Sequence, residues 1–131
     1  MIKDEVDKSI LLEGNYVNIY KTAPEKVEVS VGRYDNTISG KFGGIRVSFD
    51  KLKSLLGFEE QYRRDNNGRV ISSAVMSLEV GPNAYFIIYV DSEDIGYSMK
   101  IIFDGLTVCT SRVQFIHQVQ TIVSTITGKR I

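Results

Sequence analysis

Hydrophobic and polar residues alternate along most of this chain, and two segments change to the spacing of a helix. In residues 15–21, Val17 and Ile19 fall on one side of an extended chain, whereas Tyr16 and Tyr20 fall on the other. Successive side chains of a strand point to opposite faces. The segment therefore predicts a strand with one face toward a hydrophobic core and one face toward solvent.

Three more strands are predicted in the first half of the chain, at 26–34, 37–42 and 45–49. Asp35–Asn36 and Gly43–Gly44 lie between them, and these residue types favour tight turns. In the strand at 26–34, alternation predicts that the valines face the core. These residues are Val27, Val29 and Val31.

The first helical spacing follows this series of strands directly. Leu52, Leu55 and Leu56 recur at intervals that place them on one face of a helix. Asp50 is positioned to cap the first turn, and Gly57 is positioned to end the helix. We expect the three leucines to pack on a sheet.

A polar connector at 58–73 separates this half from a second one with the same order of patterns. Within it, residues 65–68 (Asp-Asn-Asn-Gly) are a strong turn signal. The strands predicted after the connector are 74–80, 84–90, 97–103 and 106–110.

The longest helical spacing covers 112–127 and follows the last of these strands. Thr110 or Ser111 can cap it, and Gly128 follows its last turn. Because many of its residues have poor helix propensity, we expect packing to stabilise it, in a homodimer that uses this helix or Ile10–Leu12. The predicted hydrophobic face is Phe115, Val119, Ile122, Val123 and Ile126.

These patterns predict an α+β fold of two antiparallel four-stranded sheets, each followed by a helix, as an internal ββββα duplication. We expect an N-terminal arm at 1–14 and a single domain at 15–131. The domain would consist of half-units 15–57 and 74–128, joined by the connector. Sequence identity between the halves is low, so two unrelated series of strands are the alternative.

Charge, cysteine content and the length of hydrophobic runs limit the functions and locations that the protein can have. Sixteen basic and sixteen acidic residues cancel among 131, so no overall field draws polyanions to the protein. A single cysteine excludes an internal disulfide and fits a reducing compartment. The chain shows no signal-peptide pattern and no hydrophobic run of membrane-spanning length. We therefore expect a cytoplasmic location, or the host cytoplasm for a viral protein, and no membrane partner.

No residue pattern indicates catalysis, a metal or a cofactor. His117, the only histidine, has no metal-ligating residue three or four positions away, and a catalytic pair with Cys109 depends on geometry that sequence does not show. The glycine-rich segment 40–44 lacks the spacing of a phosphate loop, so we expect a hairpin turn there. The acids at 91–94 do not follow a calcium-loop pattern. We expect a protein that is not an enzyme and has no cofactor.

The most informative feature is a pair of tyrosines in each half, on the side of a strand away from its core-facing residues. Tyr16 and Tyr20 form the first pair, and Tyr85 and Tyr89 form the second. A nucleic-acid base stacked on an aromatic ring contributes about 1–3 kcal/mol whatever its identity, and nearby cations hold the phosphates. The basic residues expected near these faces are Arg33, Lys41, Arg46, Arg63, Arg64, Arg69 and Lys100.

The order of elements resembles that of the Whirly family and a doubled form of the single unit in the transcriptional positive cofactor four proteins. The segments that carry the resemblance are GGIRVSFDKLKSLLG and DGLTVCTSRVQFIHQVQTIV, in which a short hydrophobic strand runs into a helix. The resemblance covers most of 15–128 as a topology and includes no family binding motif. It implies binding of single-stranded DNA or RNA on the sheet face away from the helices, often by an oligomer.

The sequence therefore predicts a non-catalytic protein that binds single-stranded nucleic acid through aromatic and basic sheet faces. One alternative is a structural or protein-interaction protein, such as a viral or plasmid-encoded assembly factor, in which the tyrosine faces form a protein interface. Another is that tyrosines simply suit strands. After a nucleic-acid-binding protein and an interaction protein, an enzyme is the third possible functional class.

Overall fold

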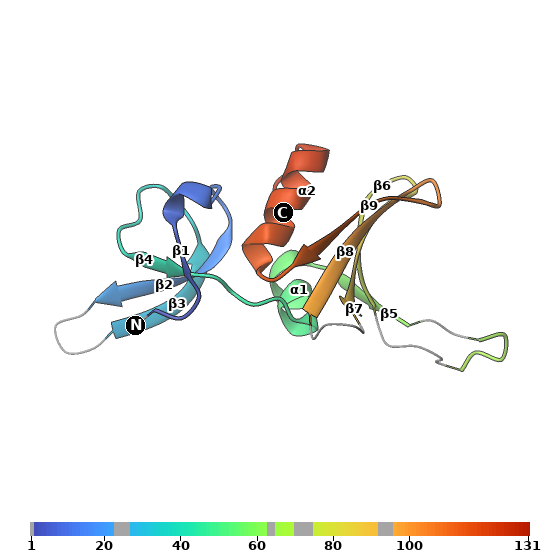
Figure 1. The fold of residues 1–131 in the computed structure, drawn as a ribbon, viewed down its shortest axis with the longest axis horizontal. Coiled ribbons are helices and arrows are strands. Elements are labelled where there is room, and N and C mark those ends of the chain that lie inside the picture. Colours follow the sequence, from blue (N-terminus) through green and yellow to red (C-terminus); the bar gives the residue numbers. More distant parts are fainter. Residues whose placement is uncertain (1, 23–26, 63–64, 70–74, 92–95) are drawn as a thin grey trace. The chain divides into compact units, whose positions relative to one another are not determined.

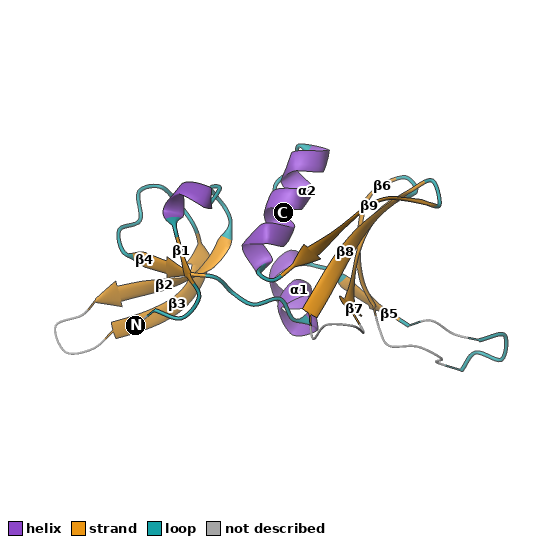
Figure 2. Cartoon of the chain, viewed as in Figure 1, coloured by secondary structure: helices purple, strands orange, loops and turns teal. Residues whose placement is uncertain are grey.

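The computed structural model describes residues 2–22, 27–62, 65–69, 75–91 and 96–131. They form two antiparallel sheets and two helices (Figures 1 and 2), so the α+β prediction is confirmed. Two compact units result. Unit 1 comprises Met1–Arg46 and Phe115–Ile131, and unit 2 comprises Val47–Gln114. Unit 2 is thus inserted into the chain of unit 1, which differs from the consecutive halves expected from sequence.

The sheet of unit 1 has the strand order β1-β4-β2-β3. Two of the predicted strands are present as β2 and β3, and the third is shortened to β4. The predicted strand at 45–49 is absent, and within it only Arg46 forms an isolated bridge, with Phe115. The strands of this sheet are β1 (Glu5–Val6), β2 (Tyr16–Thr22), β3 (Val27–Arg33) and β4 (Lys41–Gly43).

The fourth strand of this sheet comes from the predicted N-terminal arm, because β1 pairs with β4. A short 3₁₀ helix, η1 (Lys8–Ile10), follows it. Leu11 is buried, while Ile10 and Leu12 are exposed. The arm therefore contributes to the core of unit 1. That core consists of Val6, Leu11, Val17, Ile19, Tyr34 and Phe42, with Ile38 packed against it.

The prediction that the β3 valines face the core is wrong. β2 and β3 pair in an unbroken antiparallel register in which Asn18 lies opposite Val31 and Tyr20 opposite Val29. Directly opposite residues share a face of the sheet, so the valines lie on the side of the tyrosines. Val27 is 58% exposed, Val29 53% and Val31 46%.

The core side of β3 is instead occupied by its even-numbered residues. Gly32 lies opposite Val17, and a Cβ added to Gly32 would stand 2.8 Å from Cδ1 of Ile19. The next residue on this side is Tyr34, which is buried and makes an edge-on contact with Phe42, with the ring centroids 5.3 Å apart. The large aromatic ring of Tyr34 therefore occupies the part of the core in which the sequence pattern predicted the β3 valines.

Helix α2 (Ile116–Thr127) packs against β2 within unit 1. It begins later than predicted, because strand β9 of unit 2 continues to Val113. Its N-cap residue is Phe115 and not Thr110 or Ser111, and the Phe115 N–H donates a 3.0 Å hydrogen bond to Oε1 of Gln118 in the first turn. Gly128 ends the helix with a φ of 72°, as expected.

The buried face of α2 differs in part from the predicted one. Val119 and Val123 are buried as expected, whereas Ile126 is 53% exposed. The remaining buried residues of the helix are Ile116, His117 and Gln120. Gln120 anchors the helix to unit 1, since its Oε1 accepts a 2.7 Å hydrogen bond from the Tyr16 N–H.

In the described part of unit 2, the sheet has five strands in sequence order, so the prediction of two four-stranded sheets is wrong. The additional strand, β5, lies in the predicted connector. Because unit 1 also has a different strand order, the exact ββββα duplication is not confirmed. The strands are β5 (Glu59–Gln61), β6 (Val75–Gly81), β7 (Ala84–Asp91), β8 (Gly96–Phe103) and β9 (Leu106–Val113).

Helix α1 (Phe49–Leu56) packs against β5 and β6, so the helix that follows the first sheet in sequence belongs to unit 2. Its cap is Ser48, whose Oγ accepts a 3.2 Å hydrogen bond from the Lys51 N–H, while Asp50 lies in the first turn. Gly57 ends the helix in the left-handed conformation, as predicted. In the described residues, neither helix is long and hydrophobic enough to cross a membrane.

We expect Leu52→Ala to lower the free energy of unfolding far more than Leu55→Ala. Leu52 is fully buried, whereas Leu55 on the same helix is only partly buried. Truncation at a buried leucine costs about 2–5 kcal/mol through lost burial and the remaining cavity. Urea denaturation followed by circular dichroism measures both losses. Equal losses for the two variants would contradict the burial described above.

Candidate nucleic-acid interface

In unit 1 the predicted tyrosine pair lies on one face of the sheet, here called the outer face of unit 1. Tyr16 lies opposite Arg33 of β3, and Tyr20 lies opposite Lys41 of β4. The Arg33 guanidinium carbon is 4.2 Å from the centre of the Tyr16 ring. The structure therefore brings together Tyr16, Tyr20, Arg33 and Lys41, which the sequence had placed near one face.

Arg33 is also held by the backbone of unit 1. Its Nη1 donates to the carbonyl oxygens of Gly14, at 2.9 Å, and Ile131, at 3.2 Å. These bonds place the guanidinium over Tyr16 while the side chain remains exposed. A cation over an exposed ring contributes about 0.5–1 kcal/mol, so a ligand can compete for either partner.

Tyr20 borders an open depression with a volume of about 700 Å³, which Lys21, Val27 and Lys41 also line. A Cβ added to Gly43 would stand 3.0 Å from Cε2 of Tyr20, so this glycine allows the ring to lie close to β4. Lys41 Nζ is 3.9 Å from a Glu5 carboxylate oxygen, and both side chains are largely exposed. Exposed ion pairs contribute little, so Lys41 can exchange this partner for another anion.

In unit 2 the second tyrosine pair also lies away from the core, as predicted. Phe86 and Ile88 on the opposite side of β7 have no exposed surface. Tyr85 and Tyr89 are half-buried on the outer face of unit 2. Lys100 of the adjacent strand β8 places its Nζ 5.5 Å from the centre of the Tyr89 ring. Unit 2 therefore repeats the arrangement of a tyrosine with a cation over it.

Sequence reasoning missed a basic residue on the outer face of unit 2. Arg112 of β9 lies opposite Ser98, which in turn lies opposite Tyr89 of β7. The three residues therefore share one face of the sheet. The strand was expected to end at residue 110, so its last residues were not assigned to a face. The continued alternation of Ser111, Arg112 and Val113 is the signal that could have identified Arg112.

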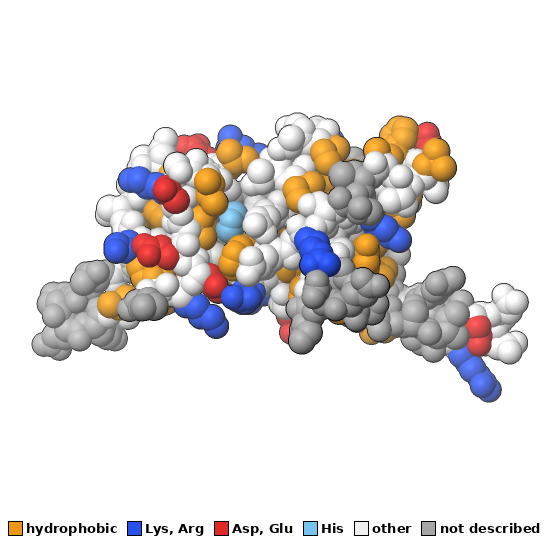
Figure 3. Space-filling model, in the orientation of Figure 1, with side chains coloured by type: hydrophobic (Ala, Val, Ile, Leu, Met, Phe, Trp, Pro, Cys, Tyr) orange, Lys and Arg blue, Asp and Glu red, His pale blue; other side chains and the backbone are white. Residues whose placement is uncertain are grey.

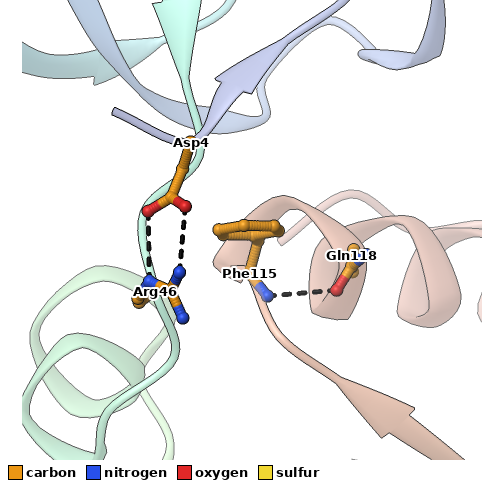
Figure 4. A network of polar contacts seen from close by, with 4 residues as sticks. All are labelled: Asp4, Arg46, Phe115 and Gln118. Carbon is orange, nitrogen blue, oxygen red and sulfur yellow. Dashed lines mark hydrogen bonds and ion pairs between the residues drawn. The ribbon is translucent and has the colours of Figure 1, made fainter. Parts of the chain in front are cut away.

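Arg46 does not lie on either tyrosine face. Its Nε and Nη2 donate to the two carboxylate oxygens of Asp4, at 3.1 and 3.0 Å (Figure 4). Its guanidinium carbon is 5.8 Å from the centre of the Phe115 ring. A bidentate pair of this kind fixes the geometry of both side chains. Arg46 thus joins the N-terminal segment to the start of α2, and we assign it a structural role.

The remaining predicted basic residues are in the former connector. Arg69 is exposed in the turn 65–69, where its carbonyl oxygen accepts a 2.9 Å hydrogen bond from the Asp65 N–H. Arg63 and Arg64 lie outside the described residues. On the face drawn in Figure 3, the described acidic and basic side chains are interspersed, in agreement with the balanced charge of the chain.

The glycine-rich segment 40–44 owes its glycines to close packing. Gly43 belongs to β4 rather than to the predicted hairpin turn, and a Cβ on it would stand 2.7 Å from the Lys3 carbonyl oxygen. A Cβ on Gly44 would stand 2.6 Å from the Phe115 ring. No residue larger than glycine fits these places without a shift of the neighbouring atoms.

His117 is buried on α2, and its ring stacks on that of Phe115 with the centroids 5.5 Å apart. The described residues offer no hydrogen-bond partner to its Nδ1. Burial lowers the pKa of His117 below its ordinary value of 6.5. Among the residues that the structure describes, no three His, Cys, Asp or Glu side chains are arranged to hold a metal ion. The side chain of Cys109 lies outside the described part of the chain.

Comparison of the chain with protein-family models, with curated proteins and with solved structures gives no match. The resemblance to the Whirly family stays a prediction.

We expect acidification to destabilise the fold through His117. Because its pKa is lower in the folded than in the unfolded chain, the unfolded chain takes up a proton first as the pH falls below about 6.5. The free energy of unfolding should therefore decrease as the pH falls from about 7 to about 5, by at most about 1.4 kcal/mol per pH unit for one proton.

The His117→Leu variant should lack the part of this pH dependence of the free energy of unfolding that His117 contributes. The test compares the free energies of unfolding of the two proteins across this pH range. Asp7 and Asp35, whose pKa values are lowered by backbone hydrogen bonds from Ser9 and Thr37, change their protonation at more acidic pH and do not interfere. A constant difference between the two proteins would show that burial of His117 does not shift its pKa.

Proposed function

We propose that this protein binds single-stranded nucleic acid, without catalysis, on the outer faces of its two sheets. The observation that carries the proposal is the recurrence of one arrangement in both units. In each unit, a tyrosine on the outer face of the sheet has a cation over its ring. Arg33 lies over Tyr16 in unit 1, and Lys100 lies over Tyr89 in unit 2.

This arrangement suits a single strand for two physical reasons. The unstacked bases of a single strand can pack on a tyrosine ring, and they need no hydrogen-bond readout to do so. Lys100 can move from its ring to a phosphate, which exchanges a cation–π contact for an ion pair. Arg33 keeps its Nη1 on the carbonyl oxygens of Gly14 and Ile131 and can offer its other N–H groups to a phosphate. A duplex keeps its bases stacked inside and offers the rings only its phosphates, so it should bind less tightly.

The depression beside Tyr20 supports the same function. Its lining includes the Tyr20 ring, Lys21 and Lys41 around a space of about 700 Å³. A base against Tyr20 would place a phosphate near Lys41, which lies opposite Tyr20 on the same face. With no net charge on the chain, the affinity depends on these local cations, and we expect it to be modest and sensitive to salt.

Fluorescence anisotropy with a labelled single-stranded oligonucleotide, measured at several salt concentrations, tests this proposal. If about four phosphates are contacted, the slope of log affinity against log salt should be near about −3. Tyr16→Ala and Tyr89→Ala should each weaken binding by about 1–3 kcal/mol and leave the slope almost unchanged. Lys100→Ala should flatten the slope by about 0.7.

Matched controls come from residues away from the two outer faces. Tyr62 is 50% exposed but follows β5 and donates its hydroxyl to Glu60, so Tyr62→Ala should bind like the wild type. Lys53 is exposed on α1, so Lys53→Ala should keep the full salt slope. A wild-type protein that does not bind at low salt would refute the proposal, and so would equal losses in the face and control variants.

The valines of β3 favour a second candidate function, that of a protein-interaction or assembly protein. The three valines lie beside Tyr16 and Tyr20 on the outer face of unit 1 and are about half exposed. Surfaces that combine aliphatic and aromatic side chains and carry few charges are typical of the central part of protein interfaces. Nucleic-acid contact requires few aliphatic residues, so this feature is better explained by a protein partner.

A further inference from the structure

The free edge of β3 is the least protected part of unit 1. β3 is the last strand of its sheet, and among the described residues it pairs with β2 alone. Natural edge strands are protected against pairing with other chains by lysines, prolines, bulges or short length. β3 has seven residues, contains neither lysine nor proline, and pairs with β2 without a register shift. Its two charged residues, Glu28 and Arg33, lie near its ends and leave the central Val29–Val31 segment without a charge. Its three exposed valines make it the kind of edge that associates.

The corresponding edge of unit 2 is protected. Its last strand, β9, also carries exposed hydrophobic residues, with Leu106 72% and Val108 65% exposed. However, its pairing with β8 contains a register shift at Ile101 and Ile102. Such an irregularity bends and twists a strand and disfavours further pairing along it. Ile10 and Leu12 are exposed as well, but they lie outside the strands of the sheet.

The partner that fits this edge is β3 of a second copy. Two antiparallel copies of a seven-residue strand pair along their whole length only when the two-fold axis passes through the middle residue, Ser30. In this register Val29 lies opposite Val31 of the other copy, and Glu28 lies opposite Gly32. Arg33 lies opposite Val27. No like charges face each other, and the glycine leaves space for the glutamate.

We propose that two copies of this chain associate through antiparallel pairing of β3 with β3 about Ser30. The pairing joins two four-stranded sheets into one of eight strands and brings the valines of both copies into a continuous hydrophobic strip. β-branched residues that face each other across strands stabilise such a pair. This inference deepens the second function proposed above and does not depend on nucleic-acid binding.

The first test is the mass of Val29→Lys by light scattering at micromolar concentrations. The wild type should have twice the 14.7 kDa mass of the chain. A lysine on the edge strand is a natural protection against pairing, so the variant should have half the wild-type mass. The matched control is Val90→Lys, because Val90 is 50% exposed but lies in β7, which has neighbours on both sides. Circular dichroism confirms that both variants are folded.

The second test uses the expected register. In a Cys109→Ser background, Ser30→Cys places one cysteine of each copy across the two-fold axis, within the distance that a disulfide spans. Mild oxidation should therefore convert this variant to a covalent dimer. Val27→Cys should form much less dimer, because residue 27 lies opposite residue 33 of the other copy.

Four results would overturn the proposal. They are a monomeric wild type, a dimer that persists in Val29→Lys, a dimer that is also lost in Val90→Lys, and equal cross-linking of the two cysteine variants. If Val29→Lys weakens oligonucleotide binding without any change in mass, the face binds nucleic acid and the edge does not self-associate. Failure of the wild type to bind an oligonucleotide would refute the nucleic-acid proposal and leave this one standing.

Discussion

The register between β2 and β3 determines which surface unit 1 presents to partners. It is held at the end of the strands by two backbone hydrogen bonds, from the Tyr34 N–H to the Asn15 carbonyl oxygen at 2.6 Å and from the Gly14 N–H to the Tyr34 carbonyl oxygen at 2.8 Å. Tyr34 and Asn15 are both buried. Because a shift by one residue would turn every side chain of a strand to the other face, the position of Tyr34 in the core forces the valines of β3 outward.

The nucleic-acid proposal uses that outward face and the β3–β3 pairing uses the edge beside it, so these two proposals are compatible with each other. Pairing along the β3 edge uses backbone groups at the side of the sheet and leaves the outer face uncovered. A dimer of this kind would present Tyr16 and Tyr20 of both copies on one continuous sheet. Its two-fold arrangement would then double the number of rings and cations that a single strand can reach.

The charged residues of unit 1 have distinct roles although they are chemically alike. Arg46 is held by the Asp4 carboxylate in a bidentate pair, and Asp4 also accepts a 2.8 Å backbone hydrogen bond from Gly44. Lys41, in contrast, is paired with an exposed carboxylate, which a ligand can replace. Arg33 is intermediate, because its Nη1 is held by the Gly14 and Ile131 carbonyl oxygens while its guanidinium lies over the exposed Tyr16 ring. The supply of local cations is small, in keeping with the modest affinity expected of the nucleic-acid interface.

Local patterns in the sequence were sufficient to predict the faces of strand β7 and the ends of the two helices. Alternation placed Phe86 and Ile88 on the core side of β7 and Tyr85 and Tyr89 on the other, and the glycines at 57 and 128 ended the two helices as expected. These features depend on neighbouring residues alone, because strand periodicity and helix termination are properties of a short stretch of backbone.

Tertiary structure decided everything that depends on distant partners. The valines of β3 have the same alternation as a core strand, and only the burial of Tyr34 and the glycine opposite Val17 turn them outward. The pairing of β1 with β4, the insertion of unit 2 and the packing of α2 against β2 join segments far apart in the chain. The spacing of hydrophobic residues predicts which face of a helix or strand is buried, but it does not predict which other element covers that face.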